Sequence, residues 1–291
     1  MKKILIIGGT RFLGIQFIKL LSNSNYQFFV ASRRKIQVNN FFKIDRKNQN
    51  DLDNLFKENQ FDVVVDFINY SNSDSELLLK SIKFQQKIPK LILISSTYTY
   101  GLPKEINQDS IYKEIDFNPI KYKNKIKDRD QVSYSDGKRN MESYCMQNYR
   151  IDKLVILRFP IILGASDYTK RTHFYAEKIR NSIKINPSNI NKKNSYVFIT
   201  EAANSIFNFL NNDFYGIYNV SSGNISEKEL IKLYCIHYNI KLDELLDINL
   251  NYSDTPFSCN FDFKIDNCKY HSLFPLNTNF ESNLMQELLK I

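Results

Sequence analysis

The chain of 291 residues has no tryptophan, three histidines, four cysteines and eight glycines. The cysteines form no C-x-x-C pair and the histidines show no metal-ligand spacing, so neither a zinc site nor a dense disulfide framework is predicted. No apolar run approaches the roughly 18 to 20 residues that cross a bilayer. The apolar stretch at the start is too short for a signal peptide. We therefore expect a cytoplasmic protein with no membrane partner.

Acidic residues are fewer than basic residues, and the formal net charge is +9. Such an excess favours a polyanionic partner, which could be nucleic acid, a membrane surface or a phosphate-rich small molecule. Lysine, asparagine and isoleucine are abundant throughout, however, and a bias of the genome towards A and T explains this composition equally well. The charge alone therefore does not lead us to expect a nucleic-acid partner.

The first half alternates short apolar runs with amphipathic ones, which predicts strands and helices in turn. The expected strands are 4–7, 28–31, 41–44, 63–67, 91–94 and 154–157, and the expected helices are 12–21, 51–57, 73–84 and 134–149. Strands with consecutive apolar residues are buried on both faces, so we predict an α/β fold of the Rossmann type, with a doubly wound parallel sheet. Residues 1–165 form the expected core, to which 196–222 return, and 166–291 form a smaller C-terminal region. The charged stretch 113–130 is interpreted as an exposed insertion.

Three of the eight glycines, Gly8, Gly9 and Gly14, fall within seven residues directly after the first strand. Glycine allows a tight turn and a close approach of backbone to ligand, and the start of the following helix favours a pyrophosphate. The Gly-Lys-Ser/Thr of an NTPase loop is absent, so the turn predicts dinucleotide binding. Arg11 stands where the usual pattern has a glycine, and a structural turn without a ligand is the alternative. The candidate cofactor-binding residues here are Gly8, Thr10, Arg11, Phe12, Leu13 and Gly14.

The end of the second strand indicates which dinucleotide binds. An NAD site usually offers a carboxylate there, whereas this chain offers Ser32, Arg33 and Arg34. A hydroxyl and two guanidinium groups would hold the 2′-phosphate of NADP(H) by charge-assisted hydrogen bonds. NADP(H) is therefore predicted in preference to NAD, with an ordinary basic loop as the alternative. Asp45, at the end of the third strand, is a candidate partner of the adenine.

A catalytic pair is predicted from position and not from the motif alone. With 18 tyrosines and 30 lysines, about two Tyr-x-x-x-Lys matches are expected by chance, and the chain has three. Tyr100 and Lys104 flank a glycine and a proline, and a second match starting at Tyr149 straddles a helix and a strand. Only Tyr134 and Lys138 lie one turn apart near the start of an expected helix.

The chemistry assigned to these residues is proton transfer. A phenol with a pKa near 10 exchanges protons poorly at neutral pH until a nearby cation lowers that pKa, which is the role expected of Lys138. Ser96, at the end of the fifth strand, is expected to hydrogen-bond the same substrate oxygen as Tyr134. Thr97 is the alternative to Ser96. Lys138 is also a candidate cofactor-binding residue.

These motifs together resemble the extended short-chain dehydrogenase/reductase superfamily. The glycine turn 8–14, the Ser-Ser-Thr stretch 95–101, the pair Tyr134/Lys138 and the Leu-Arg-Phe-Pro stretch 157–164 occur in the family's order. The form of the turn is similar to the NAD-dependent epimerase/dehydratase branch, which also includes stem-loop RNA-binding proteins. The chain departs from the pattern at Arg11, at Glu201, where aspartate is common, and in the long interval from Ser96 to Tyr134.

The resemblance implies a nucleotide-sugar substrate held between the core and the smaller C-terminal region. It makes Arg171, His173 and Arg180 candidates for contact with the substrate diphosphate. It also implies a homodimer through two long helices of each copy.

Three functions remain open. The first is an NADP(H)-dependent reductase of a nucleotide-linked 4-keto sugar, such as a dTDP-4-keto-6-deoxyhexose, with Tyr134 as proton donor. The second is an epimerase or dehydratase that keeps NAD tightly bound. The third is an RNA-binding protein on the same fold, against which the presence of Ser96, Tyr134 and Lys138 together argues.

Overall fold

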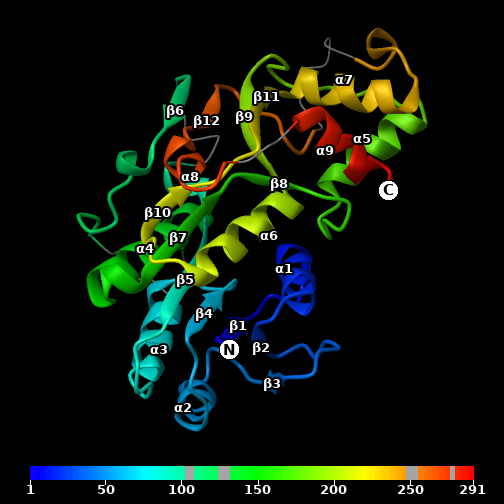
Figure 1. Cartoon of the computed structure of the whole chain (residues 1–291). Helices are drawn as coiled ribbons and strands as arrows, with labels where there is room; N and C mark the ends of the chain where they lie inside the picture. Colours follow the sequence, from blue (N-terminus) through cyan, green and yellow to red (C-terminus); the bar gives the residue numbers. More distant parts are fainter. Residues whose placement is uncertain (102–107, 124–131, 247–254, 276–278) are drawn as a thin grey trace. The chain divides into compact units, whose positions relative to one another are not determined.

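The computed structural model describes residues 1–101, 108–123, 132–246, 255–275 and 279–291 (Figure 1). The chain forms two units, each assembled from separate segments. Unit 1 consists of Met1–Tyr100, Glu114–Arg158 and Ala203–Asn219. Unit 2 consists of Gly101–Lys113, Phe159–Ala202 and Val220–Ile291.

Unit 1 is built on a seven-stranded sheet with the order β10-β7-β5-β4-β1-β2-β3. Its strands are β1 (Lys3–Ile7), β2 (Gln27–Ser32), β3 (Phe41–Lys43), β4 (Val63–Asp66), β5 (Lys90–Ser96), β7 (Leu154–Phe159) and β10 (Gly216–Asn219). The pairs β1/β2, β1/β4, β2/β3, β4/β5 and β10/β7 are parallel. All residues of β4, β5 and β7 are buried, as expected for strands covered on both faces. The predicted Rossmann-type α/β fold is confirmed.

Helices cover both faces of this sheet. They are α1 (Phe12–Ser22), α2 (Gln49–Glu58), α3 (Asn72–Ile82), α4 (Tyr134–Asn148) and α6 (Ile199–Asn208), which continues into the 3-10 helix η6 (Phe209–Asn211). Figure 1 shows α2, α3 and α4 on one face and α1 and α6 on the other. On the first face, apolar side chains of α2, α3 and α4 pack into one cluster with alternate residues of the strands. The helix starts follow local chemistry, because Asn48, Ser71 and Ser133 each accept a bond from a backbone N–H of the first turn.

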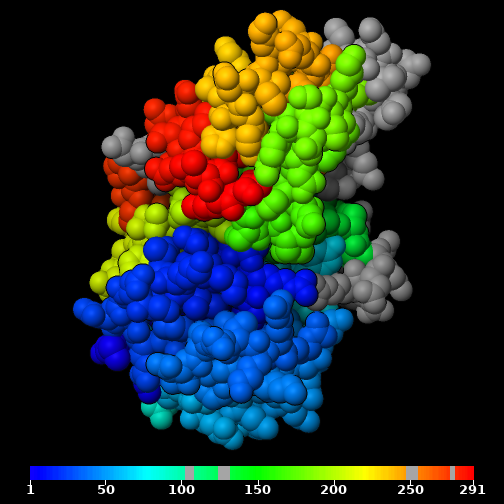
Figure 2. All heavy atoms as spheres, turned by 90° about the vertical axis from the view of Figure 1, so that its right-hand side faces the viewer, coloured from blue at the N-terminus to red at the C-terminus, as the bar shows by residue number. Residues whose placement is uncertain are grey.

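Unit 2 contains a smaller sheet with the order β11-β9-β12-β6, with β8 paired to β9. Its strands are β6 (Ser110–Tyr112), β8 (Ile161–Leu163), β9 (Lys193–Phe198), β11 (Gly223–Ser226) and β12 (Phe263–Ile265). Its helices are α5 (Arg171–Arg180), α7 (Glu227–Tyr238), α8 (Cys268–His271) and α9 (Phe280–Leu288). Figure 2 shows α9, in red, beside the gold α7 and the green α5, and the contacts α5/α7 and α7/α9 agree with this view.

Two expectations need correction. The segment 196–222 does not return to the first sheet as a whole, because Tyr196 and Phe198 of β9 pack into the core of unit 2 and only β10 joins the first sheet. The expected exposed insertion 113–130 is partly anchored. Its 3-10 helix η3 (Glu114–Asp116) and Phe117 offer backbone carbonyls to the buried guanidinium of Arg158, at 3.0 and 3.1 Å. Residues 124–131 lie outside the described residues. No helix in the described part of the chain is both long and apolar enough to cross a membrane.

Candidate functional site

The glycine positions of the turn between β1 and α1 have no room for a side chain. Gly8 and Gly9 have φ values of +80° and +70°, which favour glycine. A Cβ on Gly8 would lie 2.7 Å from Cγ2 of Ile68, and one on Gly14 would lie 2.2 Å from Cα of Gly9. The start of α1 therefore packs directly on the turn, which is the close approach that a dinucleotide site requires.

The first turn of α1 is suited to an anion. Arg11 precedes the helix with extended backbone, and its side chain makes no capping hydrogen bond to the first N–H groups. Phe12 has a φ of 41°, which is strained for a residue with a side chain and is typical of ligand-binding turns. Leu13 is buried, and its side chain serves packing. These observations fit the pyrophosphate of a dinucleotide.

A cavity of about 130 Å³ lies at the ends of β2 and β3. It is lined by Ala31, Ser32, Arg33, Ile44, Asp45, Arg46, Lys47 and Ile68. Three predicted residues, Ser32, Arg33 and Asp45, therefore meet here. The exposed Arg34 is not among the lining residues, and its carbonyl accepts a 2.6 Å bond from the Ser32 hydroxyl. Two cations that the sequence analysis did not select, Arg46 and Lys47, also border the cavity.

Arg46 is fixed by a buried ion pair. Its Nη1 lies 2.8 Å from Oδ2 of Asp66, and its Nη2 donates a 2.8 Å bond to the carbonyl of Asp74. Arg46 and Asp66 are 5% and 0% exposed, so the wall of the cavity is rigid. Asp66 ends the otherwise apolar strand β4, and a carboxylate at that place was the signal in the sequence that a buried partner exists.

Lys138 is held inside unit 1. Its Nζ donates bonds of 2.9 Å to the carbonyl of Asn69, which follows β4, and 2.7 Å to that of Ile94 in β5. Burial lowers the pKa of Lys138 to about 8, although the carboxylates of Asp66 and Glu142 oppose this change. The ammonium is therefore fixed at the carboxyl ends of two neighbouring strands, where ligands bind in such sheets.

The first two turns of α4 are bonded to the 3-10 helix η1 (Thr97–Thr99). Ser135 Oγ donates a 2.6 Å bond to the carbonyl of Tyr98, and Arg139 Nε donates a 2.8 Å bond to that of Thr99. These bonds bring Tyr134 to the turn that begins at Ser96. The Tyr134 ring lies 6.0 Å from the Tyr98 ring between centroids.

Accessibility within this arrangement differs between residues. Tyr134 is 45% exposed and Ser96 8%, whereas Thr97 is fully buried. This favours Ser96 over Thr97 for contact with a substrate. Gly137, in the middle of α4, was missed by the sequence analysis. A Cβ there would lie 2.7 Å from Cζ of Tyr70, whose ring lies 5.7 Å from that of Tyr134. A glycine inside a helix of a glycine-poor chain was the available signal.

The competing tyrosines have structural partners. The Tyr100 hydroxyl bonds Asn219 at 2.7 Å and Arg158 at 2.9 Å, and Lys104 lies outside the described residues. The Tyr149 hydroxyl donates a 2.6 Å bond to the carbonyl of Pro89.

The expected diphosphate contacts all lie on α5 in unit 2, but they do not share one site. Arg171 donates a 2.9 Å bond to Asp167 and borders a cavity of about 470 Å³. The other lining residues are Thr169, Lys170, Phe174, Glu177, Thr255 and Pro256. His173 and Arg180 are not among them, and Arg180 stacks on the Tyr238 ring at 5.5 Å. Glu201 accepts a 2.9 Å bond from Asn283, and burial raises the pKa of Glu201.

Comparison with known proteins gives one family and many similar folds. Residues 4–221 match the model of the NAD dependent epimerase/dehydratase family. Among curated protein sequences, none matches this chain. Similar solved structures include a dTDP-glucose 4,6-dehydratase from Bacillus anthracis in complex with NAD, with 17% identity, a TM-score of 0.75, and 100% and 96% of the two chains covered.

Two epimerases have similar folds as well. The UDP-glucose 4-epimerase of Thermotoga maritima, solved with UDP-glucose, has 14% identity, a TM-score of 0.73 and coverage of 99% and 98%. The UDP-glucuronic acid 4-epimerase of Bacillus cereus, solved with UDP-glucuronic acid and NAD, has 17% identity, a TM-score of 0.73 and the same coverage. These likenesses show the fold. Because the family model covers well over half of the chain, this protein belongs to the NAD-dependent epimerase/dehydratase family, a group of extended short-chain dehydrogenase/reductase enzymes.

Proposed function

We propose that the protein is an NADP(H)-dependent reductase of a nucleotide-linked 4-keto sugar. The observation that carries the coenzyme assignment is the lining of the cavity at the ends of β2 and β3. Arg33 and Lys47 border it, and the end of β2 offers no carboxylate to a ribose 2′-hydroxyl. Two cations beside Asp45 would hold a 2′-phosphate, which a carboxylate at the end of β2 would repel. Preference for NADP(H) fits a net reduction.

The arrangement of α4, η1 and β5 supports the catalytic roles proposed for Ser96, Tyr134 and Lys138. When bound, a reduced nicotinamide supplies the hydride for such a reaction. Tyr134, exposed at the start of α4, donates the proton from its hydroxyl to the carbonyl oxygen of the sugar. Ser96 orients that oxygen from the turn to which α4 is tied. Two roles are assigned to Lys138, whose ammonium donates to two carbonyls: its charge favours ionisation of the Tyr134 phenol, and its remaining N–H holds the coenzyme ribose.

Two carboxylates of α4 already form ion pairs with arginine side chains. Asp136 lies 3.2 Å from Arg139, and Glu142 lies 2.6 Å from Arg158. Eliminating water from a sugar needs a further acid or base beside the group that serves the carbonyl. The engagement of these carboxylates supports a reaction with a single proton-transfer group over a dehydration.

An epimerase with tightly bound NAD is the second candidate. It is favoured by the similar structures that are named as epimerases, one of them solved with NAD. An epimerase would use the same Tyr134, Lys138 and Ser96, with no net consumption of coenzyme.

The deciding experiment offers the purified protein a dTDP-4-keto-6-deoxyhexose with NADPH or NADH. We expect turnover with NADPH and a loss of kcat of about 10² to 10⁴ in Tyr134→Phe. Tyr144→Phe, on the same helix, is the matched control and should keep its activity. Absence of coenzyme consumption, together with NAD retained through purification and an epimerised product, would replace the reductase by the epimerase.

A further inference from the structure

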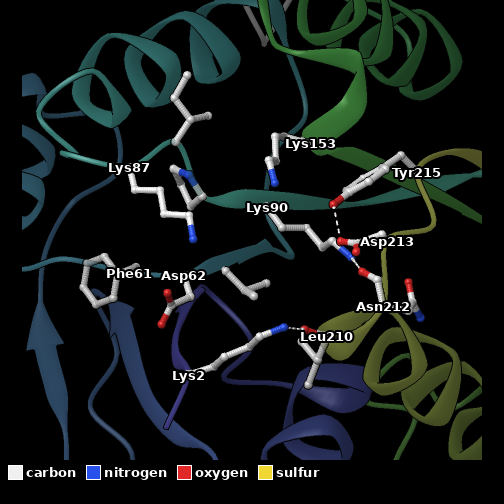
Figure 3. Close-up of a pocket in the computed structure, with 13 residues that line it drawn as sticks. Lys2, Phe61, Asp62, Lys87, Lys90, Lys153, Leu210, Asn212, Asp213 and Tyr215 are labelled. Atoms are coloured by element: carbon white, nitrogen blue, oxygen red, sulfur yellow. Dashed lines mark hydrogen bonds between the residues drawn. The ribbon is translucent and has the colours of Figure 1, made fainter.

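A second cavity in unit 1, of about 150 Å³, lies at the amino ends of the strands, whereas the coenzyme site lies at their carboxyl ends (Figure 3). Its walls come from residues at the beginnings of neighbouring strands. Lys2 precedes β1, Asp62 precedes β4, Lys90 begins β5, Lys153 precedes β7 and Tyr215 precedes β10. The glycine turn follows the other end of β1, and five residues at about 3.3 Å each separate the two places by roughly 16 Å. The cavity is therefore distinct from the coenzyme site.

The cavity carries an excess of positive charge. Four lysines border it, Lys2, Lys87, Lys90 and Lys153, against the two carboxylates of Asp62 and Asp213. Each carboxylate accepts a hydrogen bond from a neutral group, and the charge of Asp213 also acts on Lys90. Asp62 accepts a 2.8 Å bond from the backbone N–H of Lys3, and Asp213 accepts a 2.9 Å bond from the hydroxyl of Tyr215.

Among the described residues, none of these four lysines forms an ion pair. Lys90 is only 7% exposed. Burial is the main cause that lowers the pKa of Lys90 to about 8, and the charges of Lys2 and Lys153 act in the same direction while the Asp213 carboxylate opposes them. An anion in the cavity would relieve the repulsion between these ammonium groups.

Helix capping explains only two of these lysines. Lys90 Nζ donates to the carbonyls of Phe209, at 3.0 Å, and Asn212, and Lys2 Nζ donates to that of Leu210 at 3.1 Å. These bonds satisfy carbonyls at the end of η6, as cations at helix C-termini do. Lys87 and Lys153 make no such bond to this helix end. Lys153 Nζ lies 5.7 Å from the centre of the Tyr215 ring, and Lys90 Nζ lies 4.7 Å from it, so both ammonium groups face one aromatic wall.

We propose that this cavity is a binding site for a compact phosphate dianion, held by Lys87, Lys153 and the remaining N–H of Lys90. The dianion is either inorganic phosphate or the terminal group of a small phosphate monoester. Charge-assisted hydrogen bonds from two or three ammonium groups are the usual means of holding such a group. The inference adds a site to the proposed enzyme and does not depend on which sugar it acts on.

The test is a calorimetric titration of the full-length protein with inorganic phosphate at constant ionic strength, with and without NADPH. Lys87→Ala/Lys153→Ala removes two side chains of the cavity that make no capping bond. Lys19→Ala/Lys232→Ala removes the same charge from exposed positions elsewhere and is the matched control. We expect saturable phosphate binding in the wild type and in the control. The dissociation constant for phosphate should be at least about tenfold higher in Lys87→Ala/Lys153→Ala. A parallel titration with glycerol 3-phosphate distinguishes a monoester from free phosphate as the better ligand.

A second readout places the anion. In protein labelled with ¹⁵N-lysine, phosphate binding at this cavity should shift the Nζ signal of Lys90, also when NADPH is present. Two results would overturn the proposal: equal affinity in the two double variants, or no saturable binding of either phosphate compound to the wild type. A Lys90 signal that does not respond while phosphate binds would place the anion elsewhere and would also reject the site.

Discussion

Arg158 and Glu142 form a fully buried ion pair in which Nη2 and Oε2 are 2.6 Å apart and neither side chain is exposed. The pair joins β7 to α4, the helix that carries Tyr134 and Lys138. The rest of the guanidinium bonds the Tyr100 hydroxyl and the carbonyls of Glu114 and Phe117. The Arg158 guanidinium therefore has partners from three separate segments of unit 1: Glu142, Tyr100 and residues 114–117.

Glu142→Gln should strongly destabilise the fold. The substitution leaves a buried guanidinium without its counter-charge, which typically costs about 3 to 5 kcal/mol of the free energy of unfolding. Urea unfolding followed by circular dichroism measures this loss. The control is Asp152→Asn, because Asp152 forms a surface pair with Arg150 that is open to water and should matter little. Similar losses in the two variants would contradict a structural role for the buried pair.

Lys138→Met should change how stability depends on pH. The ordinary pKa of lysine is near 10.5, and the folded value is about 8. Between these values the unfolded chain binds more protons than the folded one, so the Lys138 contribution to the free energy of unfolding rises with pH. The penalty of burying the charge is complete below pH 8 and absent above pH 10.5. The methionine variant loses this rise.

The measurement is urea unfolding of both proteins at intervals from pH 7.5 to pH 10. Tyrosine and cysteine ionisation is common to both, so the difference between them isolates Lys138. The free energy of unfolding of the wild type should increase relative to that of Lys138→Met as the pH rises. Lys83→Met, at an exposed position, is the control and should keep the wild-type slope. A pH-independent difference between wild type and Lys138→Met would show that the ammonium is not desolvated.

Arg33→Ala should lower affinity for NADPH more than affinity for NADH. Arg33, Arg34 and Lys35 are all exposed, but only Arg33 borders the cavity at the end of β2. Loss of one charge-assisted bond to a phosphate corresponds to about tenfold in the dissociation constant of NADPH. Fluorescence titration with both coenzymes measures the ratio. Arg34→Ala and Lys35→Ala serve as controls of equal charge, and an effect of the same size in all three would indicate a general field instead of a contact.

Gly137→Ala should destabilise the protein although alanine is the better helix former. The propensity gain is about 1 kcal/mol, while forcing a methyl group against packed atoms typically costs about 1 to 3 kcal/mol. The methyl group would lie 2.7 to 2.8 Å from ring and backbone atoms of Tyr70. A double-mutant cycle with Tyr70→Ala, measured by urea unfolding, should show that part of the loss disappears when the ring is absent. A stabilised Gly137→Ala protein would refute the crowding.

The regular elements of unit 1 were predictable because their signals are local. Runs such as residues 4–7 and 63–65 are apolar on consecutive positions, and such runs are buried between two layers of helices. The turn at Gly8 to Gly14 was predictable for the same reason, since its glycines and the helix that packs on them are adjacent in sequence. Strand β9 was assigned to the wrong sheet, because its apolar residues indicate burial but not against which partner.

The remaining parts of the candidate site depend on residues that are far apart in sequence. Arg46 and Asp66 meet because β3 and β4 end at the same edge, and Gly137 meets Tyr70 because α4 packs beside α3. The lysine cavity gathers Lys2, Lys90 and Lys153 from the beginnings of three strands. Composition and spacing do not predict these contacts, because each contact depends on how elements that are distant in sequence are arranged in the fold.

The segmented make-up of unit 1 has a consequence for its synthesis. Its last strand, β10, covers the edge of β7 but leaves the ribosome only after β8, α5 and β9 of unit 2 have emerged. A nascent or truncated chain that stops near residue 165 would expose the backbone of β7 as an open edge and would lack the carbonyls that Lys2 and Lys90 bind. The core is thus not an excisable fragment, and a shortened protein designed to isolate it must rejoin residues 203–219 to residue 158 by a linker.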